Sequence, residues 1–153
     1  ARAAGVDGFI VPDLPVDEGG AFYDRAAAAG LDAVQLVAPT SPDDRVRMIG
    51  ERSRGFLYYV SLTGVTGSRQ KLAADLPRRL SQIRKLTDKP LCVGFGVSTP
   101  AHAAELGRAA DGVIVGSALI DCWEKAGPGP AGLAAAGKFI ASLRKGLDAL
   151  KGG

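Results

Sequence analysis

The sequence predicts an α/β fold in which about five parallel strands alternate with helices. Five short apolar runs recur along the 153 residues, and a segment of helical length follows each of them. The connections are long enough for crossovers, which make neighbouring strands parallel. The frame Asp-Gly-x-Ile-Val occurs at Asp7 and again at Asp111, after an alanine-rich segment each time. Because one βα unit is repeated, the pattern favours a barrel over a doubly wound sheet.

The boundaries of the elements follow from capping and turn residues. We expect Asp17 to cap the first helix and Ser41, with Asp44 at the third position, to open the second. Pro77 is compatible with a helix only near its first turn, so the third helix is expected to start at about Ala73. The loop before it, from Ser61 to Arg69, is the longest connection. The expected strands are Val6–Val11, Ala33–Val37, Gly55–Val60, Leu91–Gly96 and Gly112–Ser117, and the expected helices are 17–29, 41–51, 73–86, 100–109, 117–125 and 132–150.

Composition narrows the functional class. The net charge of +3 and the pI near 9.0 suit an anionic metabolite, but the basic residues are scattered and few aromatic residues accompany them, which argues against nucleic-acid binding. No apolar run approaches the roughly 18 residues that span a bilayer, so we expect a cytoplasmic protein without a membrane partner. Cys92 and Cys122 lack a CxxC spacing and are expected to be structural thiols in a reducing compartment.

Cofactor and metal chemistry finds no support in the sequence. No GxGxxG follows the first strand, and no GxxxxGK[ST] occurs. No cluster of His, Cys or carboxylate residues has metal-ligand spacing, and we expect neither a metal nor a cofactor. The single histidine, His102, is expected to be a solvated helix residue, and Trp123 a packing residue.

The stretch from Leu91 to Ser117 is the most informative part of the chain. Two apolar runs end there on glycines, Gly96 and Gly116, and glycine at a strand end lets backbone amides approach a ligand without a Cβ in the way. The second run enters a helix directly at Ser117, whose first-turn N–H groups favour an anion. We therefore expect Gly96, Gly116 and Ser117 to bind the phosphate of a small metabolite.

Six motifs in the same order over nearly the whole chain resemble the tryptophan synthase alpha subunit family, a (βα)8 barrel that cleaves indole-3-glycerol phosphate. A full barrel takes about 250 residues, so residues 1–153 are expected to form a single C-terminal portion of it, strands four to eight. The helix-like end Ala1–Gly5, closed by glycine, is also typical of the inside of a longer domain. The motifs are Val11-Pro12-Asp13-Leu14-Pro15, Ala38-Pro39-Thr40, Tyr58-Tyr59-Val60-Ser61, Gly64-Val65-Thr66-Gly67, Val93-Gly94-Phe95-Gly96-Val97-Ser98 and Val113-Ile114-Val115-Gly116-Ser117-Ala118.

The resemblance implies further site residues. Gly67 would add an amide to the phosphate site when its loop closes, and Thr66 would hydrogen-bond a catalytic carboxylate. The aromatic and aliphatic residues Tyr58, Phe95 and Ile114 would line a slot for the indole ring, although residues of this kind are equally typical of barrel core.

The resemblance implies a carbon-carbon lyase of tryptophan biosynthesis that yields indole and glyceraldehyde 3-phosphate and docks against the tryptophan synthase beta subunit. The family's catalytic Glu and Asp would lie upstream of Ala1, so the isolated chain is expected to be inactive. Asp13 is the candidate carboxylate within the chain, with a turn-forming role as its alternative. Two other hypotheses remain open: a non-catalytic phosphate-binding partial barrel that needs a partner chain, and another phosphate-binding barrel, such as indole-glycerol-phosphate synthase or an isomerase.

Overall fold

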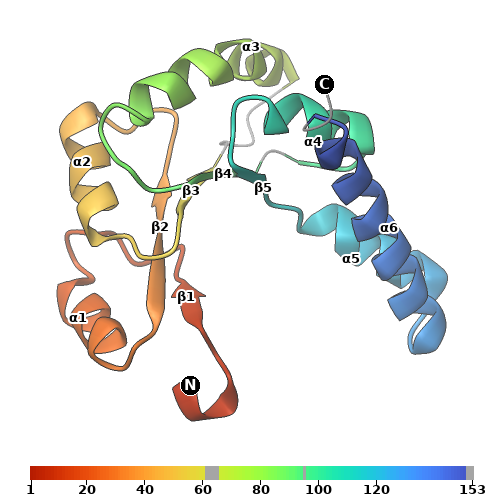
Figure 1. Cartoon of the computed structure of the whole chain (residues 1–153), viewed down its shortest axis with the longest axis horizontal. Helices are drawn as coiled ribbons and strands as arrows, with labels where there is room; N and C mark the ends of the chain where they lie inside the picture. Colours follow the sequence, from red (N-terminus) through yellow and green to blue (C-terminus); the bar gives the residue numbers. More distant parts are fainter. Residues whose placement is uncertain (61–65, 95, 151–153) are drawn as a thin grey trace. The chain divides into compact units, whose positions relative to one another are not determined.

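The computed structural model of the chain describes residues 1–60, 66–94 and 96–150. Its five strands are hydrogen-bonded in the order β1-β2-β3-β4-β5, which confirms the predicted α/β architecture of parallel strands alternating with helices. The chain divides into two compact units, Ala1–Cys92 and Val93–Gly153, with the boundary inside β4. The elements are η1 (Arg2–Ala4), β1 (Gly8–Ile10), α1 (Gly20–Ala28), β2 (Asp32–Val37), α2 (Asp43–Arg52), β3 (Leu57–Val60), α3 (Thr66–Ile83), β4 (Leu91–Gly94), α4 (Pro100–Gly107), β5 (Gly112–Val113), α5 (Ser117–Ala126) and α6 (Pro130–Asp148) (Figure 1).

The sheet of the first unit has one buried and one more open face. β2 pairs in parallel with β3, which places Val37 beside Tyr59 on one face and Leu36 beside Tyr58 on the other. Val37 and Tyr59 are 1% and 4% exposed, as expected for the face that helices cover. Leu36 and Tyr58 are only half-buried. Ile10, which pairs with Val34 on the same face as Leu36, is 45% exposed. The helices α1 and α2 both lie on one side of β2 (Figure 1).

Both predicted helix caps in the first unit are wrong. α1 begins at Gly20 after Gly19, and the Asp17 carboxylate instead forms an ion pair with Arg45 at 2.7 Å. The reason is that Pro15 to Gly19 forms a separate turn, in which the Gly19 N–H donates to the Pro15 carbonyl.

At the start of α2 the predicted capping residue is also used elsewhere. Ser41 lies one residue before Pro42, the N-cap, and its hydroxyl accepts a hydrogen bond from the Ala38 N–H at 3.1 Å. It therefore closes the turn after β2 and does not cap the helix. The acidic residues Asp43 and Asp44 occupy the first turn, where a negative charge is favourable.

The third helix is longer than predicted. α3 starts at Thr66, so four residues of the expected loop are helical and Pro77 lies well inside the helix. Arg, Gln and Lys after Ser68 are good helix formers, which explains why the helix extends toward its amino end despite the proline. Beyond Pro77 the helix is firmly held, because Leu80 and Ile83 are 1% and 0% exposed.

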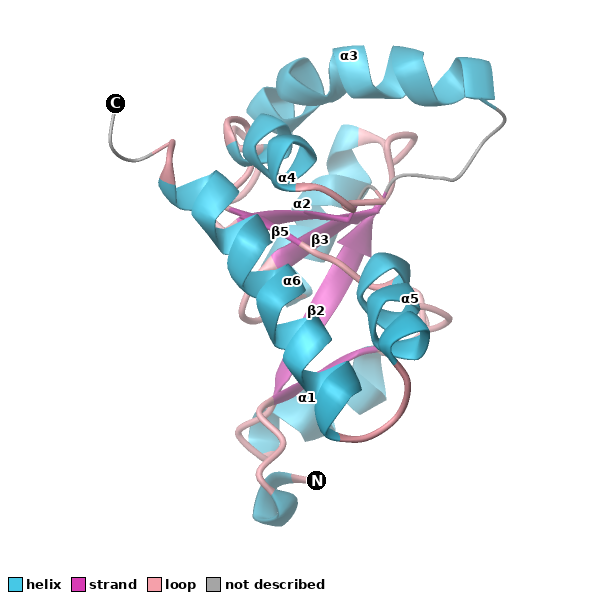
Figure 2. Ribbon diagram, turned by 90° about the vertical axis from the view of Figure 1, so that its right-hand side faces the viewer, coloured by secondary structure: helices cyan, strands magenta, loops and turns pink. Residues whose placement is uncertain are grey.

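In the second unit, α6 packs along both α4 and α5 (Figure 2). Gly146 permits the close approach to α4, since a Cβ there would lie 2.4 Å from the Pro100 carbonyl oxygen. Gly132 does the same for α5, since its Cβ would lie 2.5 Å from the Trp123 ring. Trp123 is therefore a packing residue as predicted, although it is 41% exposed. β5 is shorter than predicted, but its pairing continues because the Ile114 N–H donates to the Val93 carbonyl at 2.8 Å.

Candidate functional site

The amino end of α5 leaves backbone donors available to a ligand. Gly116 is the N-cap residue and provides no side-chain hydrogen bond, and its carbonyl accepts from the N–H groups of Leu119 and Ile120. The first N–H groups of a helix have no partner within the helix. Gly116 and Ser117 are exposed, and a Cβ at Gly116 would meet nothing within 4 Å. The geometry is that of an anion-binding helix end.

Gly96 belongs to the same unit and follows β4. Its φ of +58° lies in the left-handed region that favours glycine, and a Cβ there would also meet nothing within 4 Å. The helix that follows differs from α5, because the Thr99 hydroxyl accepts a hydrogen bond from the His102 N–H and so caps α4. Of these two helices, α5 therefore offers the uncapped donors.

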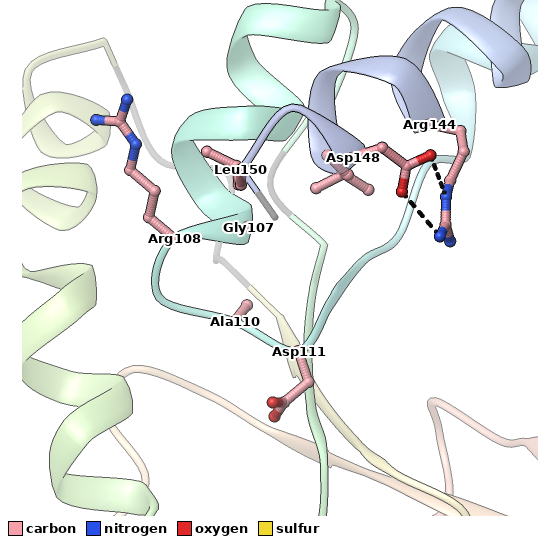
Figure 3. Close-up of a pocket in the computed structure, with 8 residues that line it drawn as sticks. Gly107, Arg108, Ala110, Asp111, Arg144, Asp148 and Leu150 are labelled. Carbon is pink, nitrogen blue, oxygen red and sulfur yellow. Dashed lines mark hydrogen bonds and ion pairs between the residues drawn. The ribbon is translucent and has the colours of Figure 1, made fainter. Parts of the chain in front are cut away.

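A cavity of about 680 Å³ lies at the other end of β5, away from Gly116. Arg144, which lines it, forms an ion pair with Asp148 at 2.9 Å. Figure 3 shows Arg108 and Asp111 pointing away from each other and from this pair. Because the charged side chains do not point toward a common position, this cavity does not have the arrangement of an anion-binding site. Its lining residues are Gly107, Arg108, Ala110, Asp111, Arg144, Leu147, Asp148 and Leu150.

The predicted indole-slot residues are placed as follows. Tyr58 lies on β3 and is half-buried on the more open face of the first-unit sheet. Ile114 directly follows β5 in the second unit and is also half-buried. Phe95 lies outside the described residues. Their common role in a slot stays a prediction.

Thr66 and Gly67 are the first two residues of α3 and not part of a loop, while 61–65 of the predicted loop lie outside the described residues. Asp13 is exposed and lies in a turn in which the Leu14 N–H donates to the Val11 carbonyl at 3.3 Å. The turn agrees with the alternative interpretation of Asp13, and its catalytic role stays a prediction.

A second cavity, of about 440 Å³, lies between the loop after β2 and α3, and its charges are internally paired. The Arg79 guanidinium donates to Asp43, Gln82 and the Ser41 carbonyl. Tyr59 also lines this cavity. Burial raises the pKa of Tyr59 above its ordinary value of 10.0, with Arg79 opposing and Asp75 adding to the increase.

Because the pKa of Tyr59 is raised, we expect the stability of the chain to fall at alkaline pH. A pKa raised by folding stabilises the protein below pH 10.0, and this contribution is lost as the pH rises through the folded-state pKa. We expect the urea midpoint of the unmodified chain to fall more steeply between about pH 9 and 11 than that of Tyr59→Phe. Parallel slopes for the two proteins would contradict this assignment.

Other sequence expectations concern isolated residues. Cys92 and Cys122 are both half-buried. His102 lies in the first turn of α4 as predicted, but it is half-buried. Within the described residues, no group of three His, Cys, Asp or Glu side chains is placed to hold a metal ion. No helix in the described part of the chain is long and apolar enough to cross a membrane.

Two polar residues that matter for the fold were missed by sequence reasoning. The buried Ser53 hydroxyl accepts from the Gln35 N–H at 3.1 Å and donates to the Phe56 carbonyl at 2.7 Å. The Tyr23 hydroxyl donates to the Leu14 carbonyl at 2.5 Å. The contacts of Ser53 with Gln35 and of Tyr23 with Leu14 leave no signal in periodicity or spacing, because their partners lie in different parts of the chain.

Comparison with known proteins identifies relatives along most of the chain. The family model for the tryptophan synthase alpha chain matches residues 1–144. The tryptophan synthase alpha chain of Chloroflexus aggregans is 54% identical over 126 residues, which cover 82% of this chain and 47% of that one. That of Geobacter sp. (strain M21) is 45% identical over 152 residues, covering 99% and 56%.

Solved structures agree with these relatives. Tryptophan synthase subunit alpha from Legionella pneumophila str. Paris superposes with a TM-score of 0.81 at 35% identity, covering 96% of this chain and 54% of that one. Tryptophan synthase from M. tuberculosis, in its aminoacrylate-bound form, superposes with a TM-score of 0.78 at 34% identity, covering 95% and 52%.

The parallel strands, the repeated βα units and the glycine N-cap of α5 shortly after β5 define a chain of the (βα)8-barrel class. The chain spans about half the length of the relatives it matches. It belongs to the tryptophan synthase alpha chain family, whose pathway is tryptophan biosynthesis. The glycines at the strand ends would also fit other phosphate-binding barrels, such as indole-glycerol-phosphate synthase or an isomerase. The family match selects the tryptophan synthase alpha chain family among them.

Proposed function

We propose that this chain carries the phosphate-binding part of a tryptophan synthase alpha-type lyase, which cleaves indole-3-glycerol phosphate to indole and glyceraldehyde 3-phosphate. The observation that carries the proposal is the uncapped amino end of α5 at Gly116, in a chain of this family. Backbone N–H groups at a helix end, together with the helix dipole, favour a phosphate dianion.

The proposed site combines two tasks. Gly96, Gly116 and Ser117 bind the phosphate through backbone N–H groups, and Gly67 adds a further amide. Tyr58, Phe95 and Ile114 line the indole slot. The glycine ends leave open space where phosphate oxygens can approach the backbone, which supports the first task.

Cleavage of the carbon-carbon bond needs an acid to protonate the indole ring at C3 and a base to deprotonate a hydroxyl group. By resemblance to the family, these are a Glu on the second barrel strand and an Asp in the loop that follows, and neither has a counterpart in the 153 residues. Thr66 is proposed to hydrogen-bond a catalytic carboxylate. A polypeptide of this sequence alone should therefore bind substrate without turnover.

The test is a titration of the 153-residue chain with indole-3-glycerol phosphate, followed through the amide resonances of Ser117 and Ala118. We expect these resonances to shift and inorganic phosphate to compete, because both ligands use the same N–H groups. No indole should be released. Unchanged resonances with both ligands would refute the phosphate site, and indole release would refute the assigned division of roles and make Asp13 the first candidate base.

A partner chain is the second part of the proposal. The more open face of the first-unit sheet, with Ile10 45% exposed and Tyr58 half-buried, supports a role in which another polypeptide covers it. The tryptophan synthase beta subunit is the proposed partner by family membership. The second candidate function is a non-catalytic partial barrel that works only in such an assembly. Sedimentation of the purified chain tests it, because a stable monomer would contradict it.

A further inference from the structure

We propose that Tyr23 is a positioning residue that holds the loop after β1, residues 11–19, in a single conformation. The proposal rests on the proposed function in one respect: barrels of this class bind their substrates at the carboxyl ends of the strands, and this loop follows the carboxyl end of β1. It carries the candidate carboxylate Asp13 at its exposed tip.

The hydrogen bond between Tyr23 and Leu14 depends on the position of the Tyr23 ring and on the glycine at position 19. Tyr23 lies in the first turn of α1, is 6% exposed, and donates its phenolic hydroxyl to the Leu14 carbonyl at 2.5 Å. Its ring occupies the place of a side chain at Gly19, since a Cβ there would lie 2.3 Å from the Tyr23 Cε2 atom. The glycine therefore permits the ring position from which the hydroxyl reaches Leu14.

The loop's own backbone bonds do not replace this tether. They join residues three or four apart: Leu14 to Val11, and Glu18 and Gly19 to Pro15. Such bonds shape two turns without linking the first turn to α1. The Tyr23 hydroxyl makes that link, because it binds the first turn from the helix.

Two other contacts hold the second half of the loop. Val16 is 6% exposed and packs into the core. Asp17 pairs with Arg45 at 2.7 Å, but both side chains are about 40% exposed (44% and 39%), where solvent weakens an ion pair. Neither contact involves the tip at Pro12 and Asp13, whereas the Tyr23 hydroxyl binds Leu14, the residue that follows Asp13.

The test compares amide hydrogen exchange in the unmodified chain and in Tyr23→Phe, which removes the hydroxyl and keeps the ring. Loss of one hydrogen bond should speed exchange at the Leu14 amide roughly five- to tenfold. Amides of β2 and β3 should keep their rates. Tyr59→Phe, which removes a hydroxyl from another buried tyrosine of the same unit, should leave the loop unchanged.

Two results would overturn the role of Tyr23. One is unchanged exchange in the loop of Tyr23→Phe, and the other is equal acceleration across the whole first unit, which would indicate a merely structural residue. The carbonyl ¹³C shift of Leu14 gives a second readout, and it should move in Tyr23→Phe and stay in place in Asp17→Asn. Phosphate titration of the unmodified chain tests the proposed function separately, since the α5 site shares no residue with this loop.

Discussion

Replacing Gly116 with alanine is expected to weaken the binding of inorganic phosphate by at least about tenfold while the chain stays folded. A Cβ at Gly116 enters open space, so it meets no protein atom within 4 Å. In the proposed complex that space holds the phosphate oxygens, and the methyl group would keep them from the first N–H groups of α5. A lost hydrogen bond to a charged group corresponds to a change of about this size.

Gly137→Ala is the matched control for this substitution. It places the same methyl group in open space on α6, where alanine suits a helix better than glycine. We expect unchanged phosphate affinity in this variant, measured by the same amide titration, and a urea midpoint no lower than that of the unmodified chain. Equal affinity of Gly116→Ala and the unmodified chain would remove Gly116 from the site.

Replacing Leu57 with alanine is expected to lower the free energy of unfolding by about 2–5 kcal/mol. Leu57 is 0% exposed and lies on β3, with its N–H bound to the Pro90 carbonyl at 2.8 Å. Truncation there removes buried carbon atoms and leaves a cavity that the surrounding sheet and helices fill only in part. Urea denaturation followed by circular dichroism measures the change.

Leu133 offers the same chemical change at an exposed position. It is 69% exposed on α6, so Leu133→Ala should alter the free energy of unfolding by less than about 0.5 kcal/mol. A comparable loss in both variants would mean that the burial of Leu57 does not determine the stability of the fold.

Sequence patterns that extend over only a few neighbouring residues predicted the positions of the strands and of some helix ends correctly. Apolar runs between turn residues located all five strands, and the glycine at the end of the run before Ser117 correctly predicted a helix that begins there. The C-cap glycine at Gly5 was also correct in kind, since it has a φ of +82° after a short helical turn. These features depend on local backbone preferences, which the residue types themselves carry.

Predictions failed where a side chain could bind more than one partner. Asp17 has the side chain of a helix cap, but Arg45 of the next helix binds it. Ser41 closes its own turn on Ala38. The periodicity of the chain also gave no reason to expect that α3 begins at Thr66.

The order of strands and helices, the glycine ends at Gly96 and Gly116 and the family motifs are determined by the sequence alone, because each is written in neighbouring residues. The tertiary structure alone decided that the Tyr23 hydroxyl reaches the Leu14 carbonyl, and that the Ser53 hydroxyl accepts from the Gln35 N–H. The physical reason is that a hydrogen bond forms with whichever group the folded chain brings within about 3 Å, and this depends on packing that no local pattern specifies.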